Sequence, residues 1–337
     1  MSNYAKLLKN YAVLLLILPL LVFTQACSDD DDDPITPAPV ESELLVAELE
    51  GANGNYMNTN CPAIVKADAV YENVTGAKTW YVMDIRTAAD FATGRVPGAV
   101  NVTRADLLTH AAANDIGSKE RVVIICYTGQ SAAWSVALLR MSGYTNVYSM
   151  KYGMSSWHTD FDKLSSKTGS MYSAQFVKDA APAKPAEGDM PMISTGKSTG
   201  ADILTDRIAA VHAEDWGGVA IDAATVFASP DQYYIVNYWG MGDYTGIGHI
   251  PGSYQYTPKA DLASTTFLKT LPTDKTVVIY CYTGQTSANV AAILKVLGYD
   301  AKTLTFGTQG MIWQDMVAAG KTAYDATNDC YGFDYEK

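Results

Sequence analysis

The stretch Arg121-Val-Val-Ile-Ile-Cys126-Tyr-Thr-Gly-Gln-Ser131 returns later in the chain as Thr276-Val-Val-Ile-Tyr-Cys281-Tyr-Thr-Gly-Gln-Thr286. Each copy is an apolar run, a cysteine, a short loop and a hydroxyl residue, followed by a segment with helical apolar periodicity. The apolar run predicts a buried strand that ends at the cysteine, and the periodic segment predicts a helix. We therefore expect each cysteine sulfur to lie over a curved loop at the N-terminus of a helix.

The repetition extends well beyond this stretch. From about residue 42 onward the chain can be laid over itself at an offset of roughly 153 to 159 residues. In both halves, short β-rich runs alternate with helical patterns, which indicates an α/β fold with a mainly parallel sheet and helices on both faces. Ligands of such sheets bind at the carboxyl ends of the strands, which is where Cys126 and Cys281 stand.

The chain of 337 residues is long enough for two domains, each with a core of its own. We expect them at residues 42–178 and 201–337, with a Pro-containing linker at residues 179–200. The net charge of -12 and the pI near 4.7 argue against a nucleic acid partner and against electrostatic docking on anionic lipid.

The N-terminal residues have the pattern of an export signal. Lys6 and Lys9 precede an apolar segment at residues 11–23, which is shorter than a comfortable membrane span. Ala26-Cys27 then resembles the end of a bacterial lipoprotein signal, and this resemblance implies a signal peptide at residues 1–27 that ends at a lipidated Cys27. A plain signal peptide with an incidental cysteine is the alternative.

Residues 28–41 are acidic and Pro-rich, which predicts a solvated, extended tether. We therefore expect an exported protein that is anchored in the cell envelope, at the outer membrane, on the periplasmic face or at the cell surface. The lipid is then the protein's only contact with the membrane.

The five cysteines and four histidines show no metal-binding spacing, so we expect neither a metal nor a cofactor. Cys61 and Cys330 stand near the start and the end of the repeated region. In an exported protein we expect these two to form a disulfide, with two free thiols as the alternative.

Four motifs of the first half resemble those of a rhodanese domain, in order and spacing. They are Asp84-Ile-Arg86, Gly94-Arg-Val-Pro-Gly98, the Cys126 loop and a terminal Gly153…Trp157. The second half resembles a second rhodanese domain. This resemblance implies a sulfurtransferase of the thiosulfate:cyanide type, in which a cysteine takes sulfane sulfur from a donor and holds it as a persulfide. A thiophilic acceptor, cyanide or a thiol, then removes that sulfur.

The resemblance makes Cys126 and Cys281 the nucleophiles. Each must react as a thiolate, and the N-terminus of a helix stabilises negative charge. The amides of a Gly-containing loop can form a nest for the outer sulfur. The expected substrate-binding residues are Tyr127, Thr128, Gly129, Gln130 and Ser131 in the first loop, and Tyr282, Thr283, Gly284, Gln285 and Thr286 in the second. The expected supporting residues are Asp84, Arg86, Arg95 and His249, with the first two as a structural ion pair.

The loops also depart from related patterns. Neither contains the arginine with which a cysteine phosphatase holds phosphate, so we do not expect that chemistry. Rhodanese loops often carry Arg or Lys, whereas these carry Tyr and Thr. In the second half, Asn237 and Trp239 also replace the Asp-x-Arg pair. We therefore expect Cys126 to prefer an anionic donor, and Cys281 a neutral donor or a partner protein.

Two functions of different classes remain open. The first is a sulfurtransferase that takes sulfur from thiosulfate, polysulfide or a persulfide and passes it to a thiol or to cyanide. The second is an envelope sulfur carrier that holds a persulfide for a sulfur-relay protein, with little turnover of its own. A non-catalytic interaction scaffold is a third interpretation, and it predicts neither a persulfide nor turnover.

Overall fold

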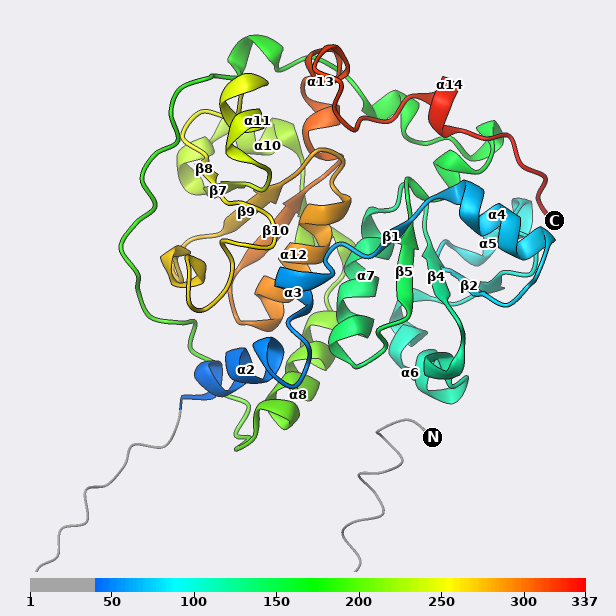
Figure 1. The fold of residues 1–337 in the computed structure, drawn as a ribbon, viewed down its shortest axis with the longest axis horizontal. Helices are drawn as coiled ribbons and strands as arrows, with labels where there is room; N and C mark the ends of the chain where they lie inside the picture. The colour runs from blue at the N-terminus through cyan, green and yellow to red at the C-terminus, as the bar shows by residue number, and fades with distance from the viewer. Residues whose placement is uncertain (1–39) are drawn as a thin grey trace, which may run out of the picture. The chain divides into compact units, whose positions relative to one another are not determined.

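The computed structural model describes residues 40–337 (Figure 1). The predicted signal peptide with Cys27, and nearly all of the predicted tether, lie outside the described residues. Among the helices of residues 40–337, none has both the length and the apolar character that crossing a membrane requires.

The first half is built on a five-stranded parallel sheet in the order β1-β5-β4-β2-β3. Its strands are β1 (Ile64–Val65), β2 (Tyr81–Asp84), β3 (Val100–Asn101), β4 (Val122–Ile125) and β5 (Val147–Met150). Its helices are α2 (Glu41–Glu50), α3 (Tyr56–Thr59), α4 (Ala67–Thr75), α5 (Ala88–Thr93), α6 (Leu107–Ala113) and α7 (Gln130–Met141). The middle strand, β4, is buried along its whole length, as its apolar run predicts.

The second half repeats this arrangement with the order β6-β10-β9-β7-β8, again all parallel. Its strands are β6 (Ala220–Ile221), β7 (Tyr234–Asn237), β8 (Tyr254–Gln255), β9 (Val277–Tyr280) and β10 (Ala301–Leu304). Its helices are α8 (Gly200–His212), α9 (Trp216–Val219), α10 (Ala223–Ala228), α11 (Met241–Gly246), α12 (Gln285–Val296), α13 (Trp313–Ala318) and α14 (Ala326–Asp329). The middle strand, β9, leads into Cys281.

Each sheet is covered on both faces, because successive side chains of a strand point to opposite sides. In β4, Val122 and Ile124 belong to one apolar core together with α7. Val123 and Ile125 belong to another core, together with α4 and Trp157. β9 alternates between two cores in the same way. The predicted α/β fold with two parallel sheets and helices on both faces is confirmed.

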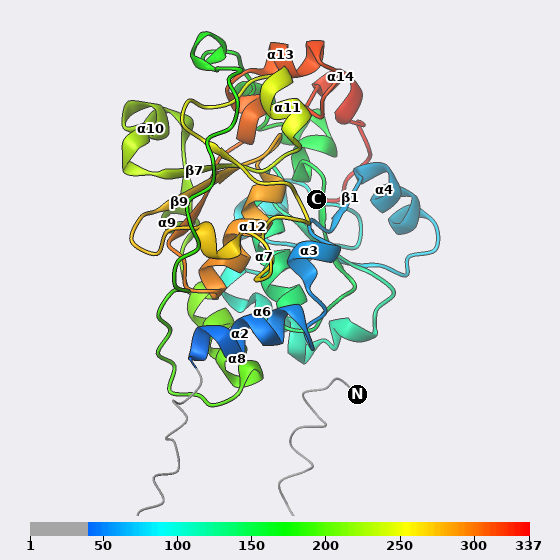
Figure 2. The ribbon, with the colours of Figure 1, turned by 60° about the vertical axis from the view of Figure 1, so that its left-hand side comes forward.

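One apolar core runs through both halves. At its centre α7 packs against α12, and α2 packs against α8 toward the lower edge of the view in Figures 1 and 2. Both α7 and α12 are buried around nearly their whole circumference. Each of the two helices packs against its own sheet on one side and against the opposite half of the molecule on its other side. Neither helix therefore has a solvent-exposed face that would have to be polar.

The last segment of each half crosses to the other half. The amide of Gly169 donates to the carbonyl of Gln309, and Val177 pairs with the backbone of His249. In return, residues 331–336 run along the first half, where the red C-terminal segment lies beside α4 in Figure 1. These backbone contacts join the end of each predicted domain to the other domain. The boundaries between the domains remain a prediction.

The expected disulfide between Cys61 and Cys330 is not formed, because both are free thiols. Cys61 belongs to the core that the halves share, on one face of the first sheet. The residues that follow Cys330 pack on the opposite face of that sheet, where Phe333 joins the core around Trp157. Burial raises the pKa of the Cys61 thiol to about 12.

Candidate active site

The first cysteine lies where the sequence predicts, between the end of β4 and the start of α7. Its Sγ accepts hydrogen bonds from the amides of Gly129, at 3.1 Å, and Ala132, at 3.4 Å. Gly129 has a φ of 85°, which a glycine adopts without strain, and this turn aims the amides at the sulfur. The Cys126 residue is 2% exposed. The loop therefore holds a buried sulfur in a cradle of backbone N–H groups.

The second cysteine has the same position between β9 and α12. Gly284 repeats the turn with a φ of 82°. The Sγ of Cys281 accepts from the amide of Ser287 at 3.3 Å, and its thiol lies 3.5 Å from the hydroxyl of that serine. Cys281 is 3% exposed. Ser287 stands where the first loop has Ala132, so a side-chain hydroxyl is added to this cradle.

The hydroxyls that close the loops do not reach the sulfur. Within residues 40–337, the side chains of Ser131 and Thr286 make no hydrogen bond, although the sequence predicts them as substrate-binding residues. The amide of the next residue, Ala132 or Ser287, contacts the sulfur instead. The first turn of the helix thus supplies the donor through its backbone, and the closing side chain is not required for it.

The loop glutamines bind the opposite half through their Oε1 atoms, and Gln130 Nε2 also donates to the Thr128 hydroxyl of its own loop at 3.1 Å. Gln130 Oε1 accepts from the amide of Phe306 at 2.7 Å. Gln285 Oε1 accepts from the amide of Tyr152 at 3.0 Å, and its Nε2 lies 3.4 Å from the carbonyl of Gly129. Both side chains are buried. We expected these glutamines in the substrate cradle, but the structure makes them a reciprocal brace between the loops.

The ion pair expected beneath the first loop is present and buried. Arg86 donates from Nε and Nη2 to both carboxylate oxygens of Asp84, with a shortest distance of 2.7 Å. Its Nη2 also donates to the carbonyl of Gly94 at 2.7 Å. A buried guanidinium needs this many acceptors to offset its lost hydration. The pair therefore ties the end of β2 to the turn at residue 94.

The second half fills the same place with neutral groups. The side-chain amide of Asn237 donates to the hydroxyl of Tyr280 at 2.8 Å, and the backbone amide of Ile250 donates to the same oxygen at 3.1 Å. Trp239 lies against the ring of Tyr282, with the centroids 5.0 Å apart. A neutral network thus replaces the ion pair, so the surroundings of the two sulfurs differ in charge.

Arg95 and His249 are engaged elsewhere. Arg95 forms an ion pair with Glu336 of the C-terminal segment, at 3.5 Å. The imidazole of His249 is buried, stacks on Tyr244 and shares a 3.0 Å hydrogen bond with its carbonyl. Burial lowers the pKa of His249, which favours the neutral ring. Both side chains hold the structure around the loops together, and within residues 40–337 neither makes a hydrogen bond or ion pair with a loop residue.

Sequence reasoning missed an acidic partner for each loop tyrosine. The Tyr127 hydroxyl donates to Asp90, and the Tyr282 hydroxyl donates to Asp243. The first of these hydrogen bonds lowers the pKa of Asp90. Burial raises the pKa of Tyr127, and the same hydrogen bond adds to that rise. Both aspartates stand at matching positions of the repeat, 153 residues apart, so a residue-by-residue overlay of the halves would have shown them.

A lysine completes each tyrosine–aspartate pair. The Nζ of Lys163 lies 4.0 Å from the centroid of the Tyr127 ring, and the Nζ of Lys321 lies 2.6 Å from Asp243. The loops lack Arg and Lys of their own, so these lysines bring a positive charge near them from the following segment. A pocket of about 370 Å³ adjoins the first tyrosine–aspartate pair. Its lining includes Arg86, Asp90, Tyr127, Phe161, Lys163 and Tyr335.

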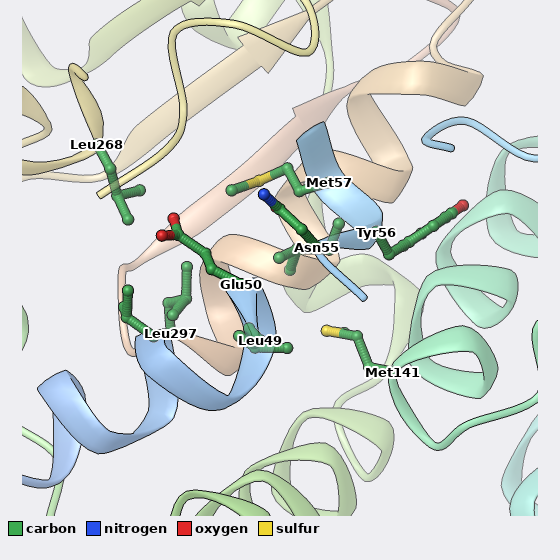
Figure 3. Close-up of a pocket in the computed structure, with 10 residues that line it drawn as sticks. Leu49, Glu50, Asn55, Tyr56, Met57, Met141, Leu268 and Leu297 are labelled. Carbon is green, nitrogen blue, oxygen red and sulfur yellow. The ribbon is translucent and has the colours of Figure 1, made fainter. Parts of the chain in front are cut away.

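A second cavity lies between the halves, and neither Cys126 nor Cys281 lines it. Figure 3 shows apolar side chains from α2, α3, the end of α7 and the end of α12 around it, among them Leu49, Met57 and Leu297. Its volume of about 20 Å³ has room for no more than a water molecule. It is a packing defect of the shared core. Among residues 40–337, no cluster of side chains has the composition of a metal site.

The comparison with known protein families decides the classification. A model of the Rhodanese-like domain matches residues 66–160 and 219–311, which together are more than half of the chain. The chain belongs to the rhodanese-like domain family. Both cysteine loops of this tandem rhodanese lie within the matched residues, as do Asp90 and Asp243.

Curated relatives of this tandem rhodanese are named as thiosulfate sulfurtransferases. GlpE of Shewanella oneidensis is 32% identical over 85 residues, which are 25% of this chain and 82% of the relative. GlpE of Pseudomonas fluorescens is 31% identical over 80 residues, 24% of this chain and 72% of the relative. The solved thiosulfate sulfurtransferase of Pseudomonas aeruginosa aligns over 85% of this chain and 49% of its own, at 18% identity and a TM-score of 0.28.

Proposed function

We propose that this tandem rhodanese is a sulfurtransferase that moves sulfane sulfur through persulfides on Cys126 and Cys281. The doubled loop carries this proposal, because each holds a cysteine sulfur against backbone amides at the N-terminus of a buried helix. Amide dipoles there stabilise an anionic sulfur, which is the reactive form of the nucleophile. The names of the curated relatives support the same class of reaction.

The reaction consists of two displacements at sulfur. The cysteine thiolate attacks the outer sulfur of a donor, the donor's S–S bond breaks, and the leaving group departs with the bonding electron pair. With thiosulfate the leaving group is sulfite; with a polysulfide or persulfide it is a shorter thiolate. An acceptor thiolate or cyanide then attacks the outer sulfur, and the cysteine leaves as a thiolate. Two half-reactions through a covalent intermediate predict ping-pong kinetics.

The surroundings of the loops suggest different donors for the two sites. The first loop adjoins a pocket with Arg86 and Lys163, which fits an anionic donor such as thiosulfate. Asn237 and Trp239 take the place of the buried ion pair beside the second loop. That loop fits a polysulfide, a persulfide or the thiol of a partner protein. Acidic groups lie near both sites, so we expect the two sites to differ in how strongly they favour each donor, and neither site to exclude a donor fully.

A soluble protein that begins at residue 28 tests the proposal. It should form thiocyanate from thiosulfate and cyanide, or take up sulfur from polysulfide. Cys126→Ser and Cys281→Ser should each remove one site, and the double variant should remove both. Undiminished activity in the double variant would contradict the proposed mechanism.

A sulfur carrier is the alternative, and the burial of both sulfurs favours it. With Cys126 and Cys281 only 2% and 3% exposed, a donor and an acceptor reach the sulfur only if the loop surroundings open. A carrier would hold a persulfide, seen as a gain of about 32 Da per cysteine, and turn over slowly until a sulfur-relay protein takes the sulfur. Mass spectrometry together with the turnover assay separates the two functions.

We also propose that the protein is exported and anchored in the cell envelope through lipid on Cys27. The motif at Ala26-Cys27 and the acidic, Pro-rich residues 28–41 support this. Cells that express the chain with labelled fatty acid should label the wild type and not Cys27→Ala. Equal labelling of both would refute lipidation at this position.

A further inference from the structure

Arg140 is a buried arginine to which the protein gives no acidic partner. It stands in the last turn of α7 and is 7% exposed. Its Nε donates to the carbonyl of Val147 at 2.7 Å. Within residues 40–337, its Nη1 and Nη2 atoms make no hydrogen bond and take part in no ion pair. Burying a guanidinium costs free energy unless acceptors replace the water that its N–H groups lose, so this arrangement calls for an explanation.

Two aromatic rings hold the guanidinium in place. Its central carbon lies 4.7 Å from the ring centroid of Tyr148 and 5.1 Å from that of Tyr56. The Tyr56 ring is itself fixed, since its hydroxyl donates to Asn289 at 2.6 Å. Contacts with ring faces stabilise a cation, but they provide no acceptor for the N–H groups at its edge. The rings therefore position the charge without neutralising it.

A pocket of about 380 Å³ adjoins this guanidinium. Both rings line it together with Arg140, and its lining also includes Pro62, Ile64 and Thr145. Of these residues, Arg140 alone is charged. The volume lies in the range of pockets that hold small organic molecules. The pocket therefore combines one fixed positive charge with mainly apolar and aromatic walls.

The second half pairs the matching cation with acids. Lys295 stands in α12 where Arg140 stands in α7, separated by the same 155 positions as the two loop cysteines. The Nζ of Lys295 lies 2.9 Å from a carboxylate oxygen of Glu214 and 3.9 Å from one of Asp300. The repeat thus contains a built-in comparison, in which the protein itself supplies the counter-charge.

The first half has a neutral residue where the second half has one of these acids. Each helix is followed by a Gly-Tyr pair, and the next residue is Asp300 in the second half but Thr145 in the first. Thr145 lines the pocket beside Arg140. The two halves therefore share the cation and differ in whether the chain supplies an anion for it.

We propose that the pocket beside Arg140 binds the carboxylate of a small organic acid. The N–H groups of Nη1 and Nη2 fit the two oxygens of a carboxylate, and Pro62 and Ile64 give its apolar part a surface to contact. The bound acid then provides the counter-charge that Glu214 and Asp300 provide in the second half. Cys126 lies at the other end of α7, about 15 Å along the helix, so this site is separate from the sulfur-transfer site.

Binding of acetate and benzoate to the soluble protein that begins at residue 28 tests the proposal. Saturation-transfer NMR titrations at constant ionic strength give the two affinities, and benzamide is the neutral counterpart of benzoate. Benzoate should bind at least about ten times as tightly as benzamide, the factor that one charge-assisted hydrogen bond corresponds to. Equal affinities for benzoate and benzamide, or no binding of either acid, would overturn the inference.

Thr145→Asp is the decisive variant, because it places a carboxylate where the second half has Asp300. It should weaken benzoate binding about tenfold or more and raise the melting temperature by about 2 to 4 °C, since Arg140 gains a partner within the chain. This variant keeps the arginine and its ring contacts, so it does not depend on a protein that has lost them.

Thr273→Asp is the matched control, because it adds the same charge at an exposed threonine of the second half. It should leave both the benzoate affinity and the melting temperature in place. Benzoate binding that is the same in Thr145→Asp and Thr273→Asp would show that Arg140 does not hold the acid. No sulfur donor is present in these titrations, so their outcome is independent of the proposed sulfur transfer.

Discussion

Replacing Gln285 by alanine should damage the opposite loop more than its own. Gln285 stands in the second loop, but its Oε1 accepts from the amide of Tyr152, and its Nε2 approaches the carbonyl of Gly129 beside Cys126. The Gln285 side chain fills the space beside Gly129: a Cβ added to Gly129 would lie 2.4 Å from the Nε2 of Gln285. The substitution therefore withdraws support from the turn that aims amides at the first sulfur.

The expected loss of stability is about 2 to 4 kcal/mol. The 3.0 Å bond from the Tyr152 amide contributes about 1 kcal/mol, and a buried amide left without a partner costs about 1 to 3 kcal/mol more. The bonds from Nε2 are 3.4 Å long and contribute little. Gln285→Met keeps most of the side-chain volume and should lose nearly as much stability, because most of the loss comes from the Tyr152 amide left without a partner.

Two measurements check this prediction. Urea denaturation followed by circular dichroism gives the change in unfolding free energy. Sulfur transfer is then measured in the Cys281→Ser background, which reports Cys126, and in the Cys126→Ser background, which reports Cys281. We expect Gln285→Ala to reduce the Cys126 activity more. A selective loss at Cys281 with unchanged stability would refute the brace and return Gln285 to its own substrate cradle.

Three further predictions concern the scaffold. Arg86→Met leaves the buried carboxylate of Asp84 unpaired and should cost about 3 to 5 kcal/mol in urea denaturation; a loss below about 1 kcal/mol would contradict a buried ion pair. Deletion of residues 331–337 should lower the melting temperature, since Trp157 loses its Nε1 hydrogen bond to the C-terminal segment and its contact with Phe333; an unchanged value would mean that this segment is not docked. Burial opposes ionisation of Asp243, but hydrogen bonds from Lys321 and Tyr282 outweigh it and lower its pKa. This carboxylate therefore stabilises the fold above about pH 3.9 and loses that contribution as the pH falls through its folded pKa, so Asp243→Asn should flatten the stability curve below about pH 4 in urea titrations.

The two sites are related by duplication but are not equivalent. Beside the first sulfur the chain places the Asp84–Arg86 ion pair, and beside the second a neutral network around Tyr280. Ser287 adds a hydroxyl group beside Cys281, at the position where the first loop has Ala132. Identical loop sequences therefore specify the same backbone cradle, while residues outside the loops set the polarity around each sulfur.

Several side chains expected to bind the substrate do not contact the sulfur, for one reason. Ser131, Thr286 and the two glutamines lie in the loops, and proximity in sequence suggested that they touch the substrate. In the structure backbone amides contact the sulfur, the two glutamines bind the opposite half, and Ser131 and Thr286 make no side-chain hydrogen bond within residues 40–337. That these residues bind a substrate stays a prediction. The direction of a side chain depends on what packs beyond the loop, which the local pattern does not contain.

What the sequence by itself determined is local. The apolar runs of β4 and β9, the glycines that take positive φ at residues 129 and 284, and the periodic helices that follow were all predictable. So were the duplication, the α/β class and the resemblance to rhodanese. These features arise from residues that are neighbours in the chain, where propensity, turn geometry and alternation of apolar residues are sufficient.

Only the tertiary structure decided which distant groups meet at each sulfur. The packing of α7 against α12 brings Gln285 to Tyr152 and Gln130 to Phe306, across 133 and 176 positions of sequence. Within residues 40–337 it also leaves the hydroxyl of Tyr152 without a protein partner and carries the C-terminal segment onto the first half. Such contacts follow from the fit between two helices that are each buried on nearly all sides, and no local pattern encodes that fit.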